Sequence, residues 1–215
     1  MIATELTFVR HGQAQCNVDG VVGGPRTCTG LTDLGRRQMT LTAARLVSEH
    51  EANPFTHLYS GPRRRLIESG RILADTLDVP LTISNTLDGP VHGEADGKPW
   101  HEVKTSFRGG PHAHPDQPWA PGSDTWNGYL KLAGEVLADL IHNHQGARVL
   151  FAAHGETVLA THALLLDLRA GLMTSFTVDH ASITHWQLHR NRFDDERWML
   201  LRHNDTSHLT PLASS

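Results

Sequence analysis

The stretch FVRHG, residues 8–12, raises a question about the fold, because an apolar run ends abruptly in Arg10, His11 and Gly12. The run LTFV at 6–9 is short, β-branched and aromatic, which is typical of a strand covered on both faces of a mostly parallel sheet. Ligands of such open sheets bind in the crevice outside the carboxyl ends of the strands. We therefore expect Arg10 and His11 to stand in that crevice, with Gly12 allowing the backbone to approach a ligand closely.

Strand and helix patterns alternate along the chain. Apolar runs predict strands at 57–60, 79–84 and 147–153, and alternating runs predict two further strands near a sheet edge at 182–189 and 197–203. Periodic segments predict helices over 34–50 with Thr32 as N-cap, from about Pro62 to 77, over 124–144 and over 156–168. This alternation predicts an α/β fold with a mostly parallel central sheet.

Residues 88–123 differ from the rest of the chain because they are rich in Gly, Pro, His and Trp and show no periodicity. A segment of this length without clear elements is usually a functional lid or disordered. The pairings Pro99-Trp100 and Pro118-Trp119 favour an ordered cover. We expect an irregular lid insertion over about 88–123.

Length and charge limit the class of protein. A chain of 215 residues fits a single domain over 1–215, with 39% hydrophobic and 20% charged residues, which is ordinary. The net charge of −4 argues against a nucleic-acid partner, and no apolar run is long enough for a membrane span. The first residues lack the features of a signal peptide, so a cytoplasmic location is expected. Oligomeric state is not readable, and a homodimer stays an option.

Cysteine and histidine content adds two expectations. Cys16 and Cys28 are too few for a disulfide framework and are expected to be free thiols in a reducing compartment. Histidine is abundant, with 16 residues, so net charge and activity should depend on pH.

Two later stretches add weight to the first. Alone, Arg-His-Gly is only suggestive, since Arg10 could cap a strand end and His11 could pack in a turn. However, SGPRRRLIESG at 60–70 places arginines 63–65 at a strand-to-helix junction, where helix amides already favour an anion. AAHGET repeats the strand-ending His-Gly at 154–155. Histidines and arginines at the carboxyl ends of strands in one sheet predict a pocket for a tetrahedral oxyanion, and a phosphoryl group fits best.

These motifs together resemble the histidine phosphatase superfamily, the clan that includes cofactor-dependent phosphoglycerate mutase and many small phosphatases. The matching stretches lie in order from residue 6 to about 209 and read FVRHGQAQCN, GLTDLGRRQ, YSGPRRRLIESG, LFAAHGET and NDTSHL. The resemblance implies a three-layer α/β fold with helices on both faces of the sheet, and a reaction through a phosphohistidine.

The resemblance also implies roles for single residues. His11 would be the nucleophile, with Arg10, Arg65 and His154 around the phosphoryl oxygens. Asn17 matches an asparagine that the family places in the pocket, and Gln13 and Glu94 are further candidates for substrate binding. Arg65 best fits the family spacing, so Arg63 and Arg64 are expected to be solvated helix residues.

The chemistry of phosphoryl transfer is compatible with these residues and needs no metal or other cofactor. Charge spreads over three equatorial oxygens in this reaction, so positioned cations supply most of the catalysis. Arg10, Arg65 and a protonated His154 would provide them. His11 must be neutral on its attacking nitrogen, which requires its other ring nitrogen to donate to a backbone carbonyl or a similar partner.

One residue of the family pattern is missing. The family usually carries a glutamate four residues before a glycine, here Gly93, and this acid protonates the leaving oxygen and then activates water. Gly89 occupies that position in this chain. Asp88 lies one residue away and is the best candidate for the acid, although it could equally be a turn residue in Asp-Gly-Pro. Glu94 is the second candidate.

Three function classes follow. The first is a phosphatase acting on a small phosphorylated metabolite. The second is a phosphoglycerate-type mutase, and the third is a divergent non-hydrolytic relative that binds a phosphorylated ligand, motivated by Gly89. A zinc hydrolase is a distant fourth, because its candidate ligands lie in no regular element that would fix metal geometry; they are His92, His101, His112 and His114.

Overall fold

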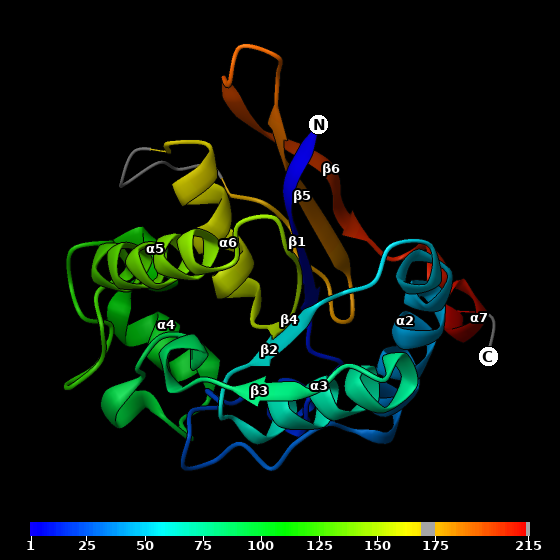
Figure 1. Cartoon of the computed structure of the whole chain (residues 1–215). Helices are drawn as coiled ribbons and strands as arrows, with labels where there is room; N and C mark the ends of the chain where they lie inside the picture. Colours follow the sequence, from blue (N-terminus) through cyan, green and yellow to red (C-terminus); the bar gives the residue numbers. More distant parts are fainter. Residues whose placement is uncertain (169–174, 214–215) are drawn as a thin grey trace.

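The computed structural model describes residues 1–168 and 175–213 and contains a six-stranded sheet in the order β3-β2-β4-β1-β5-β6 (Figure 1). The strands β3, β2, β4 and β1 pair in parallel, whereas β5 is antiparallel to β1 and β6 is antiparallel to β5. The predicted mostly parallel sheet and the predicted edge position of β6 are therefore confirmed. The strands are β1 (Ile2–Arg10), β2 (His57–Ser60), β3 (Leu81–Ile83), β4 (Arg148–Ala153), β5 (Ile183–Arg190) and β6 (Glu196–Asp205).

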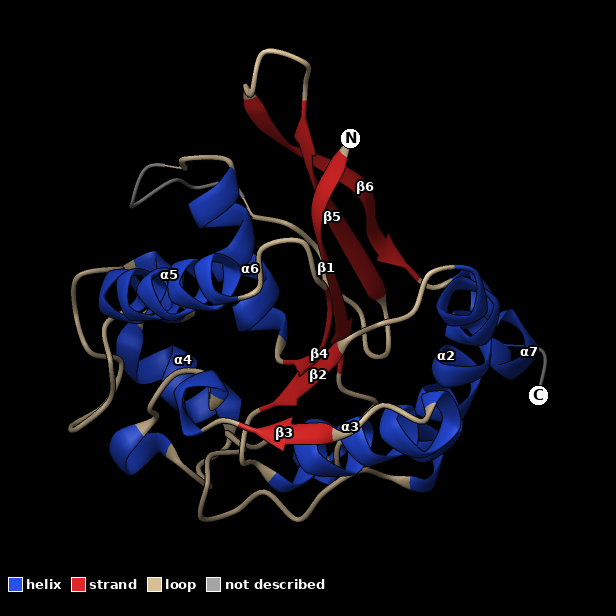
Figure 2. Ribbon diagram, viewed as in Figure 1, coloured by secondary structure: helices blue, strands red, loops and turns tan. Residues whose placement is uncertain are grey.

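Helices cover both faces of the sheet (Figure 2), which confirms the expected three layers. The α-helices are α1 (Gln15–Val18), α2 (Asp33–Ala52), α3 (Arg64–Leu77), α4 (Trp100–Phe107), α5 (Trp126–Asn143), α6 (Gly155–Leu165) and α7 (Thr210–Ala213). Short 3-10 helices are η1 (Asn85–Leu87), η2 (Gly93–Ala95), η3 (Pro111–Ala113) and η4 (Ser207–Leu209). Among the described residues, no helix is long and apolar enough to span a bilayer.

The alternation of side chains along β1 builds one core on each face. Val9 packs with α2 and α3, around Met39 and Leu73. Phe8 points to the opposite face, where its ring stacks on Phe151 of β4 at 4.6 Å between centroids, beneath α5 and α6. Burying a side chain of this size contributes about 1.5–3 kcal/mol. Every residue of β4 is buried, as expected for a strand in the middle of the sheet.

The loop after β1 is held against the start of α2. Thr32 is the N-cap that the sequence predicts, since its hydroxyl accepts a hydrogen bond from the amide of Gly35 at 3.0 Å. A Cβ at Gly12 would lie 2.3 Å from the Gly35 carbonyl oxygen. Gly12 therefore lets this loop pack directly against α2, and its expected role in letting the backbone approach a ligand stays a prediction.

The insertion over 88–123 contains more regular structure than the sequence predicts. It carries the eight-residue helix α4 and the 3-10 helices η2 and η3. Its apolar side chains form a cluster of their own with the loop after α1, around Val22, Val103 and Trp119. The segment is thus an ordered cover, and the prediction of an irregular one is wrong for α4.

Candidate active site

The carboxyl ends of the parallel strands bring the predicted residues together. His11 follows β1, His154 follows β4, and Arg65 lies in the first turn of α3 after β2. The rings of His11 and His154 meet edge to face with 5.4 Å between centroids. Arg65 lies between them, since its Nε donates to His11 Nε2 at 3.2 Å and its Nη2 lies 3.4 Å from His154 Nδ1.

The hydrogen bonds of His11 fix its tautomer. Its Nδ1 lies 2.8 Å from the Gly12 carbonyl oxygen, and a carbonyl can only accept, so Nδ1 carries the proton. Nε2 therefore carries the lone pair of the ring, and this lone pair accepts the hydrogen bond from Arg65 Nε. Burial, together with the charges of Arg65 and Arg10, holds the pKa of His11 well below its ordinary value. His11 is thus a neutral imidazole with the partner that a nucleophilic nitrogen requires.

His154 differs from the expectation of a protonated ring. Burial and the nearby charges of Arg65 and Arg63 hold its pKa well below the ordinary value, so the ring is neutral at neutral pH. Because Arg65 donates toward Nδ1, the proton of the neutral ring lies on Nε2. This Nε2 is buried and has no hydrogen-bond partner among the described residues. His154 therefore offers an unused N–H donor rather than a fixed positive charge.

Arg10 is anchored by its outer nitrogens and free at Nε. Its Nη1 donates to the Val178 carbonyl, and its Nη2 lies 3.1 Å from Nε2 of His180. Nε is buried, and no described residue pairs with it. His180 also lies 5.7 Å from His11 between ring centroids, and burial lowers its pKa to about 4. Sequence reasoning missed His180, because this residue belongs to a loop with no recognisable motif.

The residues predicted to bind substrate have different surroundings. Asn17 lies near the site, with its Oδ1 at 3.0 Å from Nε2 of His180, and this oxygen also accepts from the Ala14 amide. Gln13 accepts from the Thr32 hydroxyl at 2.9 Å and thereby supports the start of α2. Glu94 is exposed on η2, and none of its side-chain atoms has a partner among the described residues. Only Asn17 is joined to the His11 cluster by a contact of its side chain.

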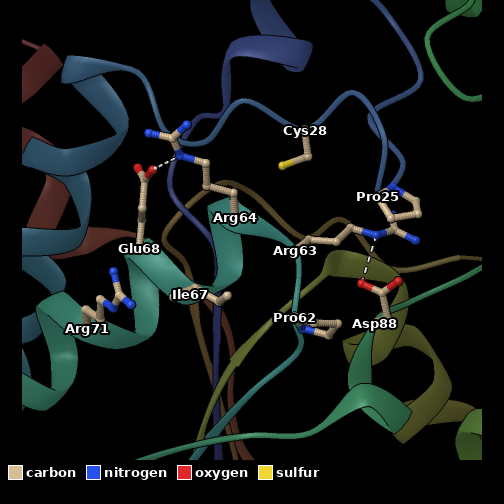
Figure 3. Close-up of a pocket in the computed structure, with 9 residues that line it drawn as sticks. All are labelled: Pro25, Cys28, Pro62, Arg63, Arg64, Ile67, Glu68, Arg71 and Asp88. Atoms are coloured by element: carbon tan, nitrogen blue, oxygen red, sulfur yellow. Dashed lines mark hydrogen bonds and ion pairs between the residues drawn. The ribbon is translucent and has the colours of Figure 1, made fainter.

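Arg63 is buried, so the prediction of a solvated side chain is wrong for this residue. Its Nε donates to Asp88 Oδ1 at 3.0 Å (Figure 3), its Nη2 donates to the Pro90 carbonyl at 2.7 Å, and its Nη1 donates to the Gly23 carbonyl at 3.3 Å. The prediction is correct for Arg64, which is exposed on the first turn of α3. Of these two arginines, Arg63 alone contacts the segment 88–92, and the spacing of residues in the sequence does not reveal that contact.

The position where the family pattern has a glutamate is Gly89 in this chain and carries no side chain. Gly89 has φ +79°, and a Cβ built there would lie 2.6 Å from His154 Cδ2 and 3.2 Å from its Nε2. A side chain at position 89 would therefore collide with the ring of His154, and the glycine lets the backbone lie directly against that ring. The adjacent Asp88 carboxyl is paired with Arg63, yet burial raises its pKa above the ordinary value. Asp88 is thus a carboxyl of raised pKa next to the glycine that packs against His154.

Two further titratable groups border the cluster. Glu156 lies in the first turn of α6 and interacts electrostatically with Arg10 and Arg65. Burial opposes its ionisation, but a hydrogen bond from its own backbone amide and the charges of these arginines lower its pKa. Glu156 is therefore a carboxylate that balances the arginines. His92 is buried with Nε2 at 3.3 Å from Arg63 Nη1, and burial lowers its pKa to about 4. Glu156 follows His154 in the HGET motif and could have been found there.

The histidines of the zinc alternative are not gathered into a site. His92 is buried beside Arg63, whereas His101 and His112 are exposed on the insertion. In the part of the chain that the structure describes, no group of three or more His, Cys, Asp or Glu side chains could hold a metal ion. The zinc alternative therefore lacks the set of ligands on which it depended.

Known proteins share both sequence and fold with this chain. A family model described as the histidine phosphatase superfamily (branch 1) matches residues 6–206. A metal-independent phosphoserine phosphatase of Arabidopsis thaliana is 22% identical over 98% of this chain and 85% of its own length. A 2,3-bisphosphoglycerate-dependent phosphoglycerate mutase of Thermoplasma acidophilum is 23% identical over 82% of this chain and 84% of its own. A solved mycobacterial glucosyl-3-phosphoglycerate phosphatase in complex with VO3 has a TM-score of 0.77 at 21% identity, covering 93% of this chain and 98% of its own.

Proposed function

Because this chain belongs to the histidine phosphatase superfamily, branch 1, we propose that it is a phosphatase that hydrolyses a small phosphorylated metabolite through a phosphohistidine on His11. The observation that carries the proposal is a set of unused polar atoms. Arg10 Nε and His154 Nε2 are buried N–H donors without partners among the described residues. Buried donors are normally satisfied, so unpaired ones at the end of a sheet favour an anionic ligand.

The first step transfers the phosphoryl group to His11. The lone pair on Nε2 attacks phosphorus, the ester P–O bond breaks, and the leaving oxygen takes a proton. Arg65 faces this nitrogen, and its Nε–H would donate to a phosphoryl oxygen instead of to His11 once the phosphoryl group is bound. Arg10 and the N–H of His154 would stabilise the charge that spreads over the phosphoryl oxygens.

We assign the proton transfers to Asp88. Burial raises its pKa, which favours the protonated form that a leaving alkoxide needs, and it is adjacent to Gly89, whose backbone packs against the ring of His154. In the second step water attacks phosphorus, the P–N bond breaks with its electron pair returning to Nε2, and the Asp88 carboxylate accepts the proton of water. Glu94 remains the alternative acid if the insertion closes over the site.

The mutase remains the second candidate, because one relative with matching sequence is a phosphoglycerate mutase. The two functions differ in the acceptor of the phosphoryl group, which is water in one case and a second hydroxyl of the substrate in the other. A mutase requires a bisphosphate primer to phosphorylate His11 before turnover. Phosphate release without primer supports the phosphatase.

We also propose that the reaction needs no metal and takes place in the cytoplasm. The arginines around His11 can supply the positive charge for which other phosphatases use metal ions. Cys16 and Cys28 are free thiols, as expected in a reducing compartment. Phosphate release should be unchanged in EDTA, and loss of activity that zinc restores would contradict the metal-free scheme.

The test of the proposed function is phosphate release from p-nitrophenyl phosphate and from a panel of metabolite phosphates. The wild-type protein should release phosphate without primer, and His11→Ala should abolish release while retaining the circular dichroism spectrum. Asp88→Asn should slow alkyl phosphates by about 10²–10⁴-fold and aryl phosphates far less, because the aryl leaving group needs little proton help. A wild-type protein that binds phosphate but hydrolyses nothing would favour the non-hydrolytic alternative.

A further inference from the structure

The insertion is joined to the loop after α1 by one buried carboxylate. Asp96 follows η2, and its side chain is 3% exposed. Its carboxylate accepts hydrogen bonds from the amides of Gly24 and Arg26 at 2.9 and 3.1 Å, and from the hydroxyl of Thr27. Burial opposes ionisation, but these hydrogen bonds lower the pKa of Asp96. Asp96 is therefore an ionised carboxylate that holds one side of this loop.

The opposite side of the same loop binds Arg65. The Gly23 carbonyl accepts from Arg65 Nη1 at 2.7 Å and from Arg63 Nη1 at 3.3 Å. This carbonyl and the Gly24 amide belong to one peptide group, which is planar and trans, so its C=O and N–H point in opposite directions. Asp96 thus binds one side of the peptide group whose other side binds Arg65.

The Gly23 carbonyl sets the orientation of the guanidinium of Arg65. A guanidinium is planar with its N–H donors in a fixed fork, so holding one nitrogen directs the other two. Those two face the histidines, since Nε donates to His11 at 3.2 Å and Nη2 lies 3.4 Å from His154 Nδ1. Among the described residues, no other oxygen accepts a hydrogen bond from this guanidinium. The orientation of Arg65 at the proposed phosphoryl position therefore depends on this one carbonyl.

Close packing confines the peptide group between Gly23 and Gly24. A Cβ at Gly23 would lie 2.4 Å from Cys16 Sγ and 3.1 Å from Arg65 Nη1. A Cβ at Gly24 would lie 2.4 Å from Asp96 Cγ. The peptide group therefore lies directly between the guanidinium and the carboxylate, and a shift of Asp96 is passed on to Arg65.

A separate contact keeps the loop attached to the insertion. The Val22 amide donates to the Lys98 carbonyl at 2.9 Å, and the Val22 carbonyl accepts from the Gly97 amide at 2.8 Å. These backbone hydrogen bonds do not involve the carboxylate of Asp96. We therefore expect the loop to stay in place when Asp96 is replaced, with the change confined to the peptide group that Arg65 binds.

We propose that Asp96 is a positioning residue for phosphoryl transfer: through the peptide group between Gly23 and Gly24 it fixes the guanidinium of Arg65 beside His11. The proposal rests on the proposed function, in which Arg65 donates to a phosphoryl oxygen. Preoriented donors stabilise the transition state more than the bound substrate, and a misplacement of about 1 Å can cost about 10²-fold in rate. The effect should therefore appear in kcat more than in KM. Vanadate should respond more than phosphate, because vanadate adopts the five-coordinate geometry of the transition state.

The first test compares Asp96→Asn with Glu5→Gln, a matched control that also replaces a buried carboxylate by an amide. The side chain of Glu5 is 8% exposed, and its partner Arg148 begins β4, whereas His154 follows the end of that strand. Asp96→Asn should lower kcat for p-nitrophenyl phosphate at least about tenfold and change KM by less than about threefold. Glu5→Gln should keep kcat within about twofold at a temperature where both variants are folded.

A second variant carries the test if Asp96→Asn does not fold. Gly24→Ala keeps the carboxylate, but the added Cβ would lie 2.4 Å from Asp96 Cγ and displace it. Gly24→Ala should therefore lower kcat in the same direction with KM little changed. Wild-type kcat in every folded variant that alters this contact would overturn the proposal.

A double-mutant comparison shows whether the effect passes through Arg65. Lysine lacks the planar fork of arginine, so Arg65→Lys removes the orientation that Asp96 is proposed to set. In the Arg65→Lys background, Asp96→Asn or Gly24→Ala should change kcat by less than about twofold, because residues that act through one contact have non-additive effects. The same fold-change in both backgrounds would show an independent structural role and overturn the proposal.

Isothermal titration separates failure of this proposal from failure of the proposed function, because it needs no turnover. Vanadate should bind Asp96→Asn at least about tenfold more weakly than wild type, inorganic phosphate at most about threefold more weakly, and Glu5→Gln should bind both normally. Equal vanadate affinity in Asp96→Asn and wild type would overturn the positioning role even if p-nitrophenyl phosphate is hydrolysed. A wild-type protein that hydrolyses nothing but shows the vanadate difference would overturn the phosphatase and leave the positioning of Arg65 standing.

Discussion

Replacing Arg63 by methionine should destabilise the protein far more than the same replacement at Arg64. The side chain of Arg63 is 1% exposed, and that of its partner Asp88 is 25% exposed. Removing one member of a buried ion pair costs about 3–5 kcal/mol because the other charge stays unpaired. Asp88 can regain some water, so we expect the lower end of that range, about 3 kcal/mol.

Arg64 supplies the internal control. Its side chain is 65% exposed and forms a helical pair with Glu68, and such pairs contribute about 0.3–0.5 kcal/mol. Urea denaturation at neutral pH measures the free energy of unfolding of the wild type and both variants, and methionine keeps the aliphatic stem in each case. If the free energies of unfolding of Arg63→Met and Arg64→Met differ by less than about 1 kcal/mol, Arg63 is solvated and the reasoning from burial is refuted.

Three more predictions concern strain and pH. Gly89→Ala should lower both the free energy of unfolding and the turnover, because Gly89 has φ +79° and its added Cβ would lie 2.6 Å from the ring of His154. Gly20→Ala is the control, since Gly20 has φ +65° but open space around it. This control should cost only the backbone strain, about 1–2 kcal/mol in urea unfolding. Burial lowers the pKa of His162 from 6.5 to about 4, so the unfolded chain binds the extra proton and stability should fall as pH drops from 6.5 to 4. His162→Gln should flatten the unfolding free energy over that interval. A hydrogen bond lowers the pKa of Glu5 from 4.5 to about 2, so its contribution is present above pH 4.5 and lost as pH falls toward 2. Acid titrations of Glu5→Gln should lack that loss, and an unchanged profile in either variant would count against the assigned group.

The sequence predicted the elements that depend on local patterns. Burial dictates the apolar composition of the strands and the periodicity of the helices, so the alternation of these two patterns predicted the α/β class. The end of each apolar run likewise predicted that strands end just before His11 and His154. The helix α4 was missed because eight residues provide little periodicity and its flanks resemble a loop.

Other parts of the site depend on tertiary contacts that no local pattern contains. Arg63 and Arg64 are adjacent and chemically identical, and only the path of the chain through Asp88 and Pro90 buries the first. His180 reaches Arg10 from a loop far along the sequence. The neutral state of His154 likewise follows from burial among arginines, which the motif alone does not convey.

The most direct test of the central proposal is to trap the covalent intermediate. The wild-type protein is mixed with a radiolabelled phosphomonoester, quenched within milliseconds and digested, and the labelled peptide is mapped by mass spectrometry. We predict one label on Nε2 of His11 that is lost in acid and stable in base, as a phosphoramidate should be, and no label in His11→Ala. A label on another residue, or complete turnover without any labelled peptide, would contradict phosphoryl transfer through His11.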